Sequence, residues 1–149
     1  MRFKRWLENN SKISEAAGCV IFAKSTGRIL LQQRSKRTSH PLVWGCWGGG
    51  MEKKETPKET VKRELKEEAG FTGDIKLISL STFVNNNFRY YSFLGLIGEE
   101  FEPKLNHESE DYIWTTLDKL PSPLHPGLKW LLSTDKNKIN NILKEENKK

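Results

Sequence analysis

The segment of residues 48–70 constrains the fold more than any other part of this sequence. Three consecutive glycines are followed by a charged stretch and then by the pattern of a capped helix. Thr56 is a suitable N-cap residue, Pro57 suits the first helical position, and Gly70 is typical of a helix end. We therefore expect one well-defined helix that directly follows a glycine-rich loop.

This helix has an apolar face and an acidic face. Val61, Leu65 and Ala69 recur at intervals of four, and such a stripe packs against a core. Three acidic residues cluster where lysines could have been interleaved: Glu64, Glu67 and Glu68. Residues three or four positions apart lie about 5–6 Å from one another, where like charges repel by roughly 0.2–0.5 kcal/mol per pair. Carboxylates grouped in this way are typical ligands of a hard cation such as Mg²⁺.

The remaining residues predict strands on both sides of this helix and further helices after them. The predicted strands span 15–24, 28–34, 75–83, 88–97 and 112–114. A turn would join the first two as a hairpin, and a loop is expected over 35–50. One helix is expected from about Gly127 through the 130s and a second after Asp135. Alternation within 75–83 places Phe83 on the same face as Leu77. This order predicts a mixed, layered α/β fold.

Length and cysteine content limit the architecture. The 149 residues fit one domain, and we expect residues 1–149 to form it, with a polar lead-in over 1–13 and a frayed tail from about 145. No apolar run approaches a membrane span, and the N-terminus lacks the apolar centre of a signal peptide. Cys19 and Cys46 are too few for a disulfide framework or a zinc site. We therefore expect a cytoplasmic protein that binds no membrane.

The net charge favours anionic partners without identifying one. Lysine and arginine number 25 against 19 acidic residues, which gives +6. A basic surplus attracts nucleotides, nucleic acid or phosphorylated metabolites. Most of the basic residues are lysines scattered along the chain, however, and solubility alone accounts for such a distribution.

Residues 49–71 resemble the 23-residue signature of the Nudix hydrolases, the family of MutT-like enzymes. That signature has a glycine, a glutamate after five further residues, and, after seven more, Arg-Glu, two adjacent glutamates and a glycine. This sequence supplies every specified position, with Phe71 the one loose fit. The resemblance implies an α/β/α sandwich with a mixed sheet and the signature loop and helix at its centre. Two positions depart from the common pattern, Trp47 replacing a frequent Pro and Lys54 a frequent Gly, and we expect altered loop shape rather than lost activity.

Family members hydrolyse a phosphoanhydride bond in a nucleoside diphosphate linked to another group. The resemblance therefore implies a pyrophosphohydrolase that acts on a small-molecule nucleotide and uses Mg²⁺, with Mn²⁺ as a possible substitute. A (d)NTP, a nucleotide sugar and a dinucleotide all remain open as substrates. Two alternatives are a domain that binds nucleotide or RNA without cleaving it and a pyrophosphohydrolase acting on RNA 5′ ends. RNA is the less favoured partner, and the sequence predicts no oligomeric state.

The same resemblance assigns residues to roles. The implied metal ligands are the carbonyl of Gly49 and the carboxylates of Glu64, Glu67 and Glu68. Glu55 and Arg63 would pair and hold the loop against the helix, in support of catalysis. A further acid commonly comes from a loop before a C-terminal strand, and Glu108 is the best candidate, with Glu110 second. Whether the general base is a glutamate of the helix or Glu108 stays open.

Four further residues are candidates for substrate binding: Arg34, Arg37, Trp44 and Tyr90. The arginines lie at the end of the second predicted strand, from which they could reach phosphate groups, and the aromatic rings could stack on a base. Each has a structural alternative, because arginines are commonly surface charges and aromatic side chains are commonly part of a core.

Overall fold

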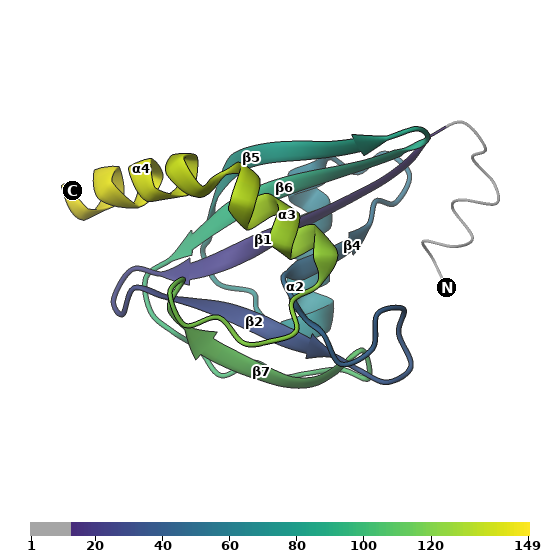
Figure 1. Cartoon of the computed structure of the whole chain (residues 1–149), viewed down its shortest axis with the longest axis horizontal. Coiled ribbons are helices and arrows are strands. Elements are labelled where there is room, and N and C mark those ends of the chain that lie inside the picture. The colour runs from purple at the N-terminus through teal and green to yellow at the C-terminus, as the bar shows by residue number, and fades with distance from the viewer. Residues whose placement is uncertain (1–12) are drawn as a thin grey trace.

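The computed structural model describes residues 13–149, in which a seven-stranded sheet carries helices on both faces (Figure 1). The strands are β1 (Ser14–Ala23), β2 (Arg28–Arg34), β3 (Trp44–Gly45), β4 (Trp47–Gly50), β5 (Lys76–Asn85), β6 (Phe88–Ile97) and β7 (Ser109–Thr115). The helices are α2 (Pro57–Ala69), α3 (Pro126–Thr134) and α4 (Lys136–Asn147). Of the predicted polar lead-in, all but residue 13 lies outside the described residues.

The sheet is mixed. Its main path has the order β3-β2-β1-β6-β5, with β4 also paired to β1 and β7 to β2. Only β1 and β6 run parallel among these pairs, and β1 forms the predicted hairpin with β2. The central strand β1 is apolar on both faces, as expected for a strand that helices cover on either side. The mixed α/β class predicted from the sequence is therefore confirmed.

Two cores lie on opposite faces of the sheet. On one face the stripe Val61, Leu65 and Ala69 of α2 packs against β1 and the fully buried Trp47. On the other face Leu128 and Leu131 of α3 and Ile139 of α4 pack against the alternate side chains of β1 and β6. In Figure 1, α3 and α4 lie in front of the sheet and α2 behind it. These layers are the α/β/α sandwich that the family resemblance implied.

The predicted loop over 35–50 is wrong in its second half, where the chain forms β3 and β4. Glycines disfavour strands, yet β4 pairs antiparallel with β1, so that Gly49 lies opposite Ala17. Close packing explains these glycines. A Cβ at Gly48 would lie 2.3 Å from the Ala17 carbonyl oxygen, and one at Gly49 would lie 2.8 Å from the Glu64 Cδ. Only glycines let this strand fit between β1 and α2.

The predicted facing of Phe83 is also wrong. Leu77 packs in the core beneath α2, whereas the Phe83 ring contacts Trp130 of α3 on the other face, with ring centroids 5.2 Å apart. A shift in register within residues 79–82 of β5 separates the two. Such a bulge reverses the alternation of every side chain that follows it, and simple period-two alternation cannot anticipate it.

Asp135, at the junction of α3 and α4, anchors this bulge. Its carboxylate accepts hydrogen bonds from the backbone N–H and the hydroxyl of Ser81, both at 2.6 Å. The sequence predicts a frayed tail from about residue 145, whereas α4 continues through Asn147 and Lys76 of β5 donates to Glu146. The C-terminal helix is thus tied to the sheet at both ends.

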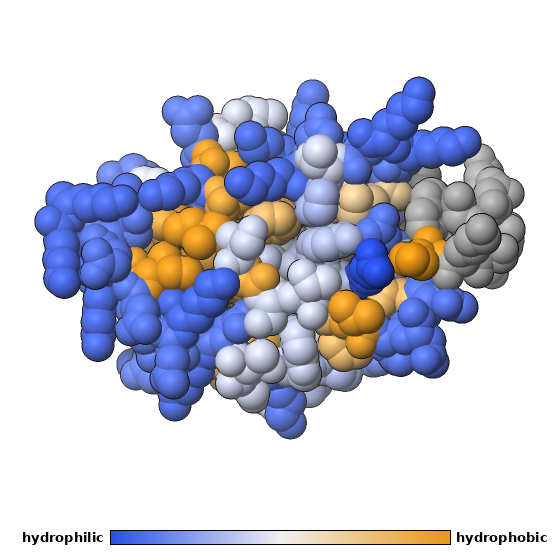
Figure 2. Space-filling model, turned by 90° about the horizontal axis from the view of Figure 1, so that it is seen from above, coloured by the Kyte–Doolittle hydropathy of each residue, from blue (hydrophilic) through white to orange (hydrophobic). Residues whose placement is uncertain are grey.

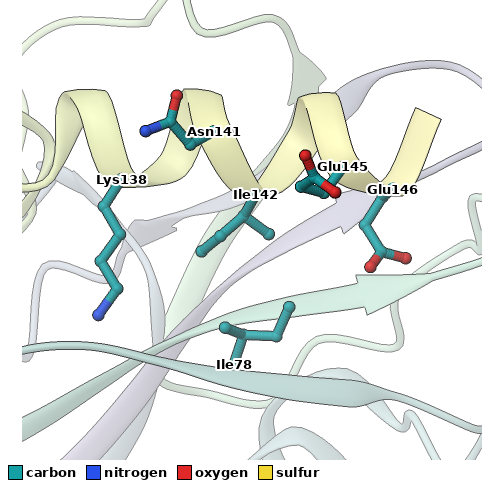
Figure 3. A pocket seen from close by; sticks show the side chains of 6 residues that line it. All are labelled: Ile78, Lys138, Asn141, Ile142, Glu145 and Glu146. Atoms are coloured by element: carbon teal, nitrogen blue, oxygen red, sulfur yellow. The ribbon is translucent and has the colours of Figure 1, made fainter. Parts of the chain in front are cut away.

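A groove of about 530 Å³ lies between α4 and β5. Ile78 of β5 and Ile142 of α4 point toward each other across it, and polar side chains of α4 line its rim (Figure 3). From above, much of the surface is hydrophilic, with one apolar patch toward the end where α4 lies and a smaller one toward the opposite end (Figure 2). The groove is on the face of the sheet opposite α2. Among the described residues no helix is long and apolar enough to cross a membrane.

Candidate active site

Helix α2 has the ends that the sequence predicts. Thr56 accepts a hydrogen bond from the Glu59 N–H, and the Glu59 carboxylate accepts one from the Thr56 N–H, which completes a capping box. At the other end Gly70 adopts φ +67°, a left-handed conformation that glycine takes without strain. These caps fix the length of the helix and hence the direction in which its glutamates point.

Arg63 gathers the acidic residues of the loop and the helix. Its Nε lies 2.6 Å and its Nη2 3.0 Å from the two oxygens of Glu55, a bidentate pair. Its Nη1 donates to Glu64 at 2.7 Å and to Glu67 at 3.5 Å. The Nη2 also donates to the Gly50 carbonyl at 3.0 Å, which ties α2 to β4. The predicted pairing of Glu55 and Arg63 is present in the structure.

The Glu55 carboxylate is held strongly in its charged form. Arg63 is the main cause, and hydrogen bonds from the Glu52 N–H and the Thr60 hydroxyl add to it, so that the pKa of Glu55 falls from 4.5 to about 2. The same contacts raise the pKa of Arg63 further above its ordinary value. Glu55 therefore keeps the loop against α2 at every pH near neutrality.

Glu64 and Glu68 are buried against the glycine strand. Their exposed fractions are 6% and 4%. Gly48 donates its N–H to Glu68 Oε1 at 3.0 Å, and the missing side chain of Gly49 leaves room for the Glu64 carboxylate. Burial is the largest cause of a raised pKa at Glu68, followed by repulsion from Glu64. Two buried like charges side by side are costly unless a cation balances them.

Glu108 joins this group from the loop before β7. It repels Glu68 and also hydrogen-bonds with it, and both effects raise the pKa of Glu68 further. Glu110, the second candidate, lies within β7 and is exposed. The structure thus brings Glu108, rather than Glu110, to the glutamates of α2. Glu67 is exposed on the same side of the helix.

Asn106 attaches this loop to α2, and sequence reasoning did not identify it. Its side-chain amide donates to the Glu67 carbonyl of α2 at 3.1 Å and accepts from the Glu108 N–H at 2.9 Å. Ser35, after β2, donates its N–H to the Glu108 carbonyl. These contacts join segments far apart in the chain, and an asparagine in a polar loop has many other uses, so no local pattern marks them.

The candidates for base binding lie on the face of α3 and α4. Tyr90 and Phe88 alternate on that face of β6, with ring centroids 6.4 Å apart, and the Tyr90 hydroxyl lies 3.6 Å from the thiol of Cys46. Trp44 packs in the core of that face. Burial raises the pKa of both Tyr90 and Cys46, and repulsion from Glu68 contributes to each. The aromatic face and the carboxylates therefore adjoin where the chain passes from Cys46 into β4.

The two arginine candidates differ in their contacts. Arg34 donates from Nε to the Ser39 carbonyl at 2.9 Å and from Nη2 to the Ser39 hydroxyl at 3.2 Å, so that it holds the loop after β2. Its charge also helps to lower the pKa of His125, mainly a result of burial, to about 4. Arg37 is exposed in the same loop.

The departure from the family pattern at Lys54 has a visible consequence. Lys54 adopts φ +68°, a left-handed conformation that favours glycine. A lysine there has the backbone that the more common glycine would take, at a cost of roughly 1–2 kcal/mol. The backbone of Lys54 is therefore strained in the loop that carries Glu55.

The oxygen donors of this site suit a hard divalent cation. Carboxylates and a backbone carbonyl are the ligands that Mg²⁺ prefers, and it completes its shell with water and substrate phosphates. In the described part of the chain, no three His, Cys, Asp or Glu side chains are grouped closely enough to hold a metal ion by themselves. A partial set of carboxylates beside an open strand fits a cation that needs few protein ligands. The buried, repelling pair Glu64 and Glu68 supports the same fit.

Comparison with known proteins decides the family. The NUDIX domain profile matches residues 12–134. The chain belongs to the Nudix family. It is 27% identical to a MutT NUDIX hydrolase from Burkholderia pseudomallei, with a TM-score of 0.65 over 82% of this chain and 97% of that one. A MutT protein from Methanosarcina mazei Go1 is 26% identical, with a TM-score of 0.61 over 93% and 97% of the two chains.

Curated relatives of this Nudix protein carry names of triphosphate-cleaving enzymes. A Mycobacterium tuberculosis protein named "Putative 8-oxo-dGTP diphosphatase 3" is 31% identical over 75% of this chain. The chain spans 57% of that relative's length. Nucleoside triphosphatase NudI of Enterobacter sp. is 26% identical over 68% of this chain and 82% of its own. These similarities show the family and the fold. Identities of 26–31% do not identify the substrate.

Proposed function

We propose that this Nudix protein hydrolyses a phosphoanhydride bond of a nucleoside triphosphate in a reaction that depends on a divalent cation. The observation that carries this proposal is the placement of Glu64 and Glu68, buried side by side against the Gly48–Gly50 strand. A protein that only bound a neutral surface would gain nothing from two repelling buried carboxylates. A cation bound between them and the substrate would offset that repulsion.

Each residue of the candidate site has its own role in the proposed reaction. Glu64, Glu67, Glu68 and the Gly49 carbonyl would hold a divalent cation, which supplies charge neutralisation for the phosphates. Arg63 keeps Glu64 and Glu67 in place, and its contacts to Glu55 and Gly50 fix it in turn. A water oxygen forms a bond to phosphorus while the bridging P–O bond breaks, and the leaving phosphate takes the electron pair. The proton of the water passes to a carboxylate, and Glu108 and the glutamates of α2 are the candidates.

The phosphates of the substrate would lie at the carboxylates of α2, and its base would lie toward Tyr90 and Trp44. The Cys46 thiol, one residue before β4, lies 3.6 Å from the Tyr90 hydroxyl, so Tyr90 adjoins the strand against which Glu64 and Glu68 are buried. Arg37 is exposed in the loop after β2 and is the better candidate for the phosphates, because the Arg34 side chain already holds Ser39.

The named relatives support triphosphates over the other substrates. The names of the Mycobacterium and Enterobacter proteins and of a Haemophilus influenzae dihydroneopterin triphosphate diphosphatase, 30% identical over 72% of this chain, all refer to nucleotide or pterin triphosphates. We therefore place (d)NTPs first, ahead of nucleotide sugars and dinucleotides.

A hydrolysis screen with purified protein tests this function. The panel holds the (d)NTPs, 8-oxo-dGTP, dihydroneopterin triphosphate, ADP-ribose, a nucleotide sugar, a dinucleoside polyphosphate and triphosphorylated RNA, each with Mg²⁺ or Mn²⁺. We expect a triphosphate to be cleaved fastest and chelation to abolish cleavage. Preferred cleavage of RNA, with strong dependence on salt, would favour an RNA 5′-end enzyme instead. Folded protein that binds nucleotide but cleaves nothing would favour the non-catalytic alternative.

A matched pair of variants tests the carboxylate site itself. Glu68→Gln should lower turnover by at least about 100-fold and leave the fold intact, because glutamine can still accept the Gly48 N–H bond. Glu59→Gln lies on the same helix and can keep its capping bond, so its turnover should stay unchanged. Equal turnover in Glu68→Gln and wild type would refute the assignment of the site.

A further inference from the structure

The loop before β7 attaches to the C-terminal end of α2. The last four carbonyls of a helix have no partners within it. Two of those in α2 are bonded by this loop, Ala69 by the N–H of Lys104 at 2.9 Å and Glu67 by the side chain of Asn106 at 3.1 Å. The loop therefore serves as a cap of the helix that carries the acidic cluster.

The same asparagine also holds the backbone of Glu108. Its Oδ1 accepts the Glu108 N–H at 2.9 Å, while its Nδ2 donates to the Glu67 carbonyl. The Ser109 N–H closes the turn onto the Asn106 carbonyl at 3.3 Å. One amide group thus bridges two backbones, one of the helix and one of the acidic loop.

We propose that Asn106 is a positioning residue for the hydrolysis, which fixes the Glu108 carboxylate relative to Glu67 and Glu68. This inference rests on the proposed function and deepens it. Only a side chain with a donor and an acceptor on one rigid group can make both bonds. Glu108 reaches Glu68 by its side chain, so a shift of its backbone moves that carboxylate away from the reacting atoms. A displacement of about 1 Å is enough to cost on the order of 100-fold in rate.

A double-mutant cycle tests the inference. The variants are Asn106→Ala, Glu108→Gln and the two combined, with Asn141→Ala on α4 as the matched control. We expect Asn106→Ala to lower kcat by about 10- to 100-fold with little change in KM, because it displaces a carboxylate and removes no substrate contact. In the Glu108→Gln background the same change should lower kcat less than about 2-fold, since the group that it positions is already gone.

A measurement apart from activity establishes that the bridge alone is broken. In Asn106→Ala, hydrogen exchange at the Glu108 amide should rise, because its acceptor is lost, while the amides of α2 keep their protection. The melting temperature should fall by a few degrees relative to the exposed control, because two hydrogen bonds are lost, while unfolding stays cooperative. These readouts separate a local shift of the loop from general unfolding, which would remove the protection of α2 as well.

The outcomes separate this inference from the proposed function. No effect of Glu108→Gln on turnover would reject the assigned role of Glu108, and the inference with it. A loss in Glu108→Gln without a loss in Asn106→Ala would overturn the inference alone. Equal losses from Asn106→Ala in both backgrounds would also overturn it, because they would show that the asparagine acts independently of Glu108.

Discussion

Replacing Glu55 with glutamine should destabilise the fold measurably. The side chain is only 17% exposed, and it accepts two bonds from Arg63 as well as one from the Glu52 N–H and one from the Thr60 hydroxyl. A glutamine has the same shape but no charge, and it turns an amide N–H toward the guanidinium. The variant thus removes the charge and one of the two bonds without opening a cavity.

The magnitude follows from the pKa of Glu55, which falls from 4.5 to about 2 mainly through Arg63. At about 1.4 kcal/mol per pH unit, this difference corresponds to about 3 kcal/mol of unfolding free energy near neutral pH. Because the pKa is lower in the folded state, the unfolded chain takes up the proton first as the pH falls. The stabilisation is therefore complete above the unfolded pKa, and about 2 kcal/mol of it is lost on going down to roughly pH 3.

Urea unfolding of wild type and Glu55→Gln across this pH range tests the reasoning. We expect a difference of about 2–3 kcal/mol near neutral pH that shrinks as the pH falls below about 4.5. Glu100→Gln is the matched control, because Glu100 also pairs bidentately with an arginine, Arg28. The Arg28 side chain is 44% exposed, against 20% for Arg63, so the effect of Glu100→Gln should be smaller. A difference that is constant with pH, or no larger than in the control, would refute the argument.

Three further substitutions probe other parts of the fold. Gly49→Ala places a Cβ 2.8 Å from Glu64 Cδ, so turnover should fall by about 100-fold while circular dichroism shows the fold retained. Lys54→Gly relieves a φ of +68° and should raise the unfolding free energy by up to about 1 kcal/mol in urea, with turnover unchanged. Asp135→Ala leaves the Ser81 N–H and hydroxyl without their acceptor and should lower the unfolding free energy by about 1–3 kcal/mol.

Local signals predicted the part of the site that is contiguous in sequence. The caps of α2, its apolar stripe and the pairing of Glu55 with Arg63 all depend on residues within a few positions of one another. Spacing along a helix fixes direction in space, so the sequence alone places Glu64, Glu67 and Glu68 on one side of α2. The same holds for the main strands, whose apolar runs are long.

Long-range packing decided what the sequence could not. The glycines of β4 are typical of a loop, and the sequence predicted one. Their role is to allow the close approach of β1 and Glu64, and this approach exists only in the folded chain. Phe83 faces α3 rather than α2 because of a bulge in β5. Asp135, which binds Ser81 in this bulge, lies 54 positions from it in the chain. Asn106 likewise bonds a carbonyl 39 positions away. None of these contacts has a periodicity that a single sequence could display.

Gly70 connects the family signature to the acidic loop and gives the last prediction. Two features require a glycine at this position. Its φ is +67°, and an added methyl group would lie only 3.2 Å from the Cβ of Lys104. Gly27 has a similar φ of +74° with open space around it, so Gly27→Ala measures the backbone strain alone, roughly 1–2 kcal/mol. Gly70→Ala should destabilise the fold more than Gly27→Ala, and it alone should lower turnover, because moving Lys104 loosens the loop that holds Glu108. Equal effects of the two variants on stability and on turnover would show that this glycine serves the helix end only.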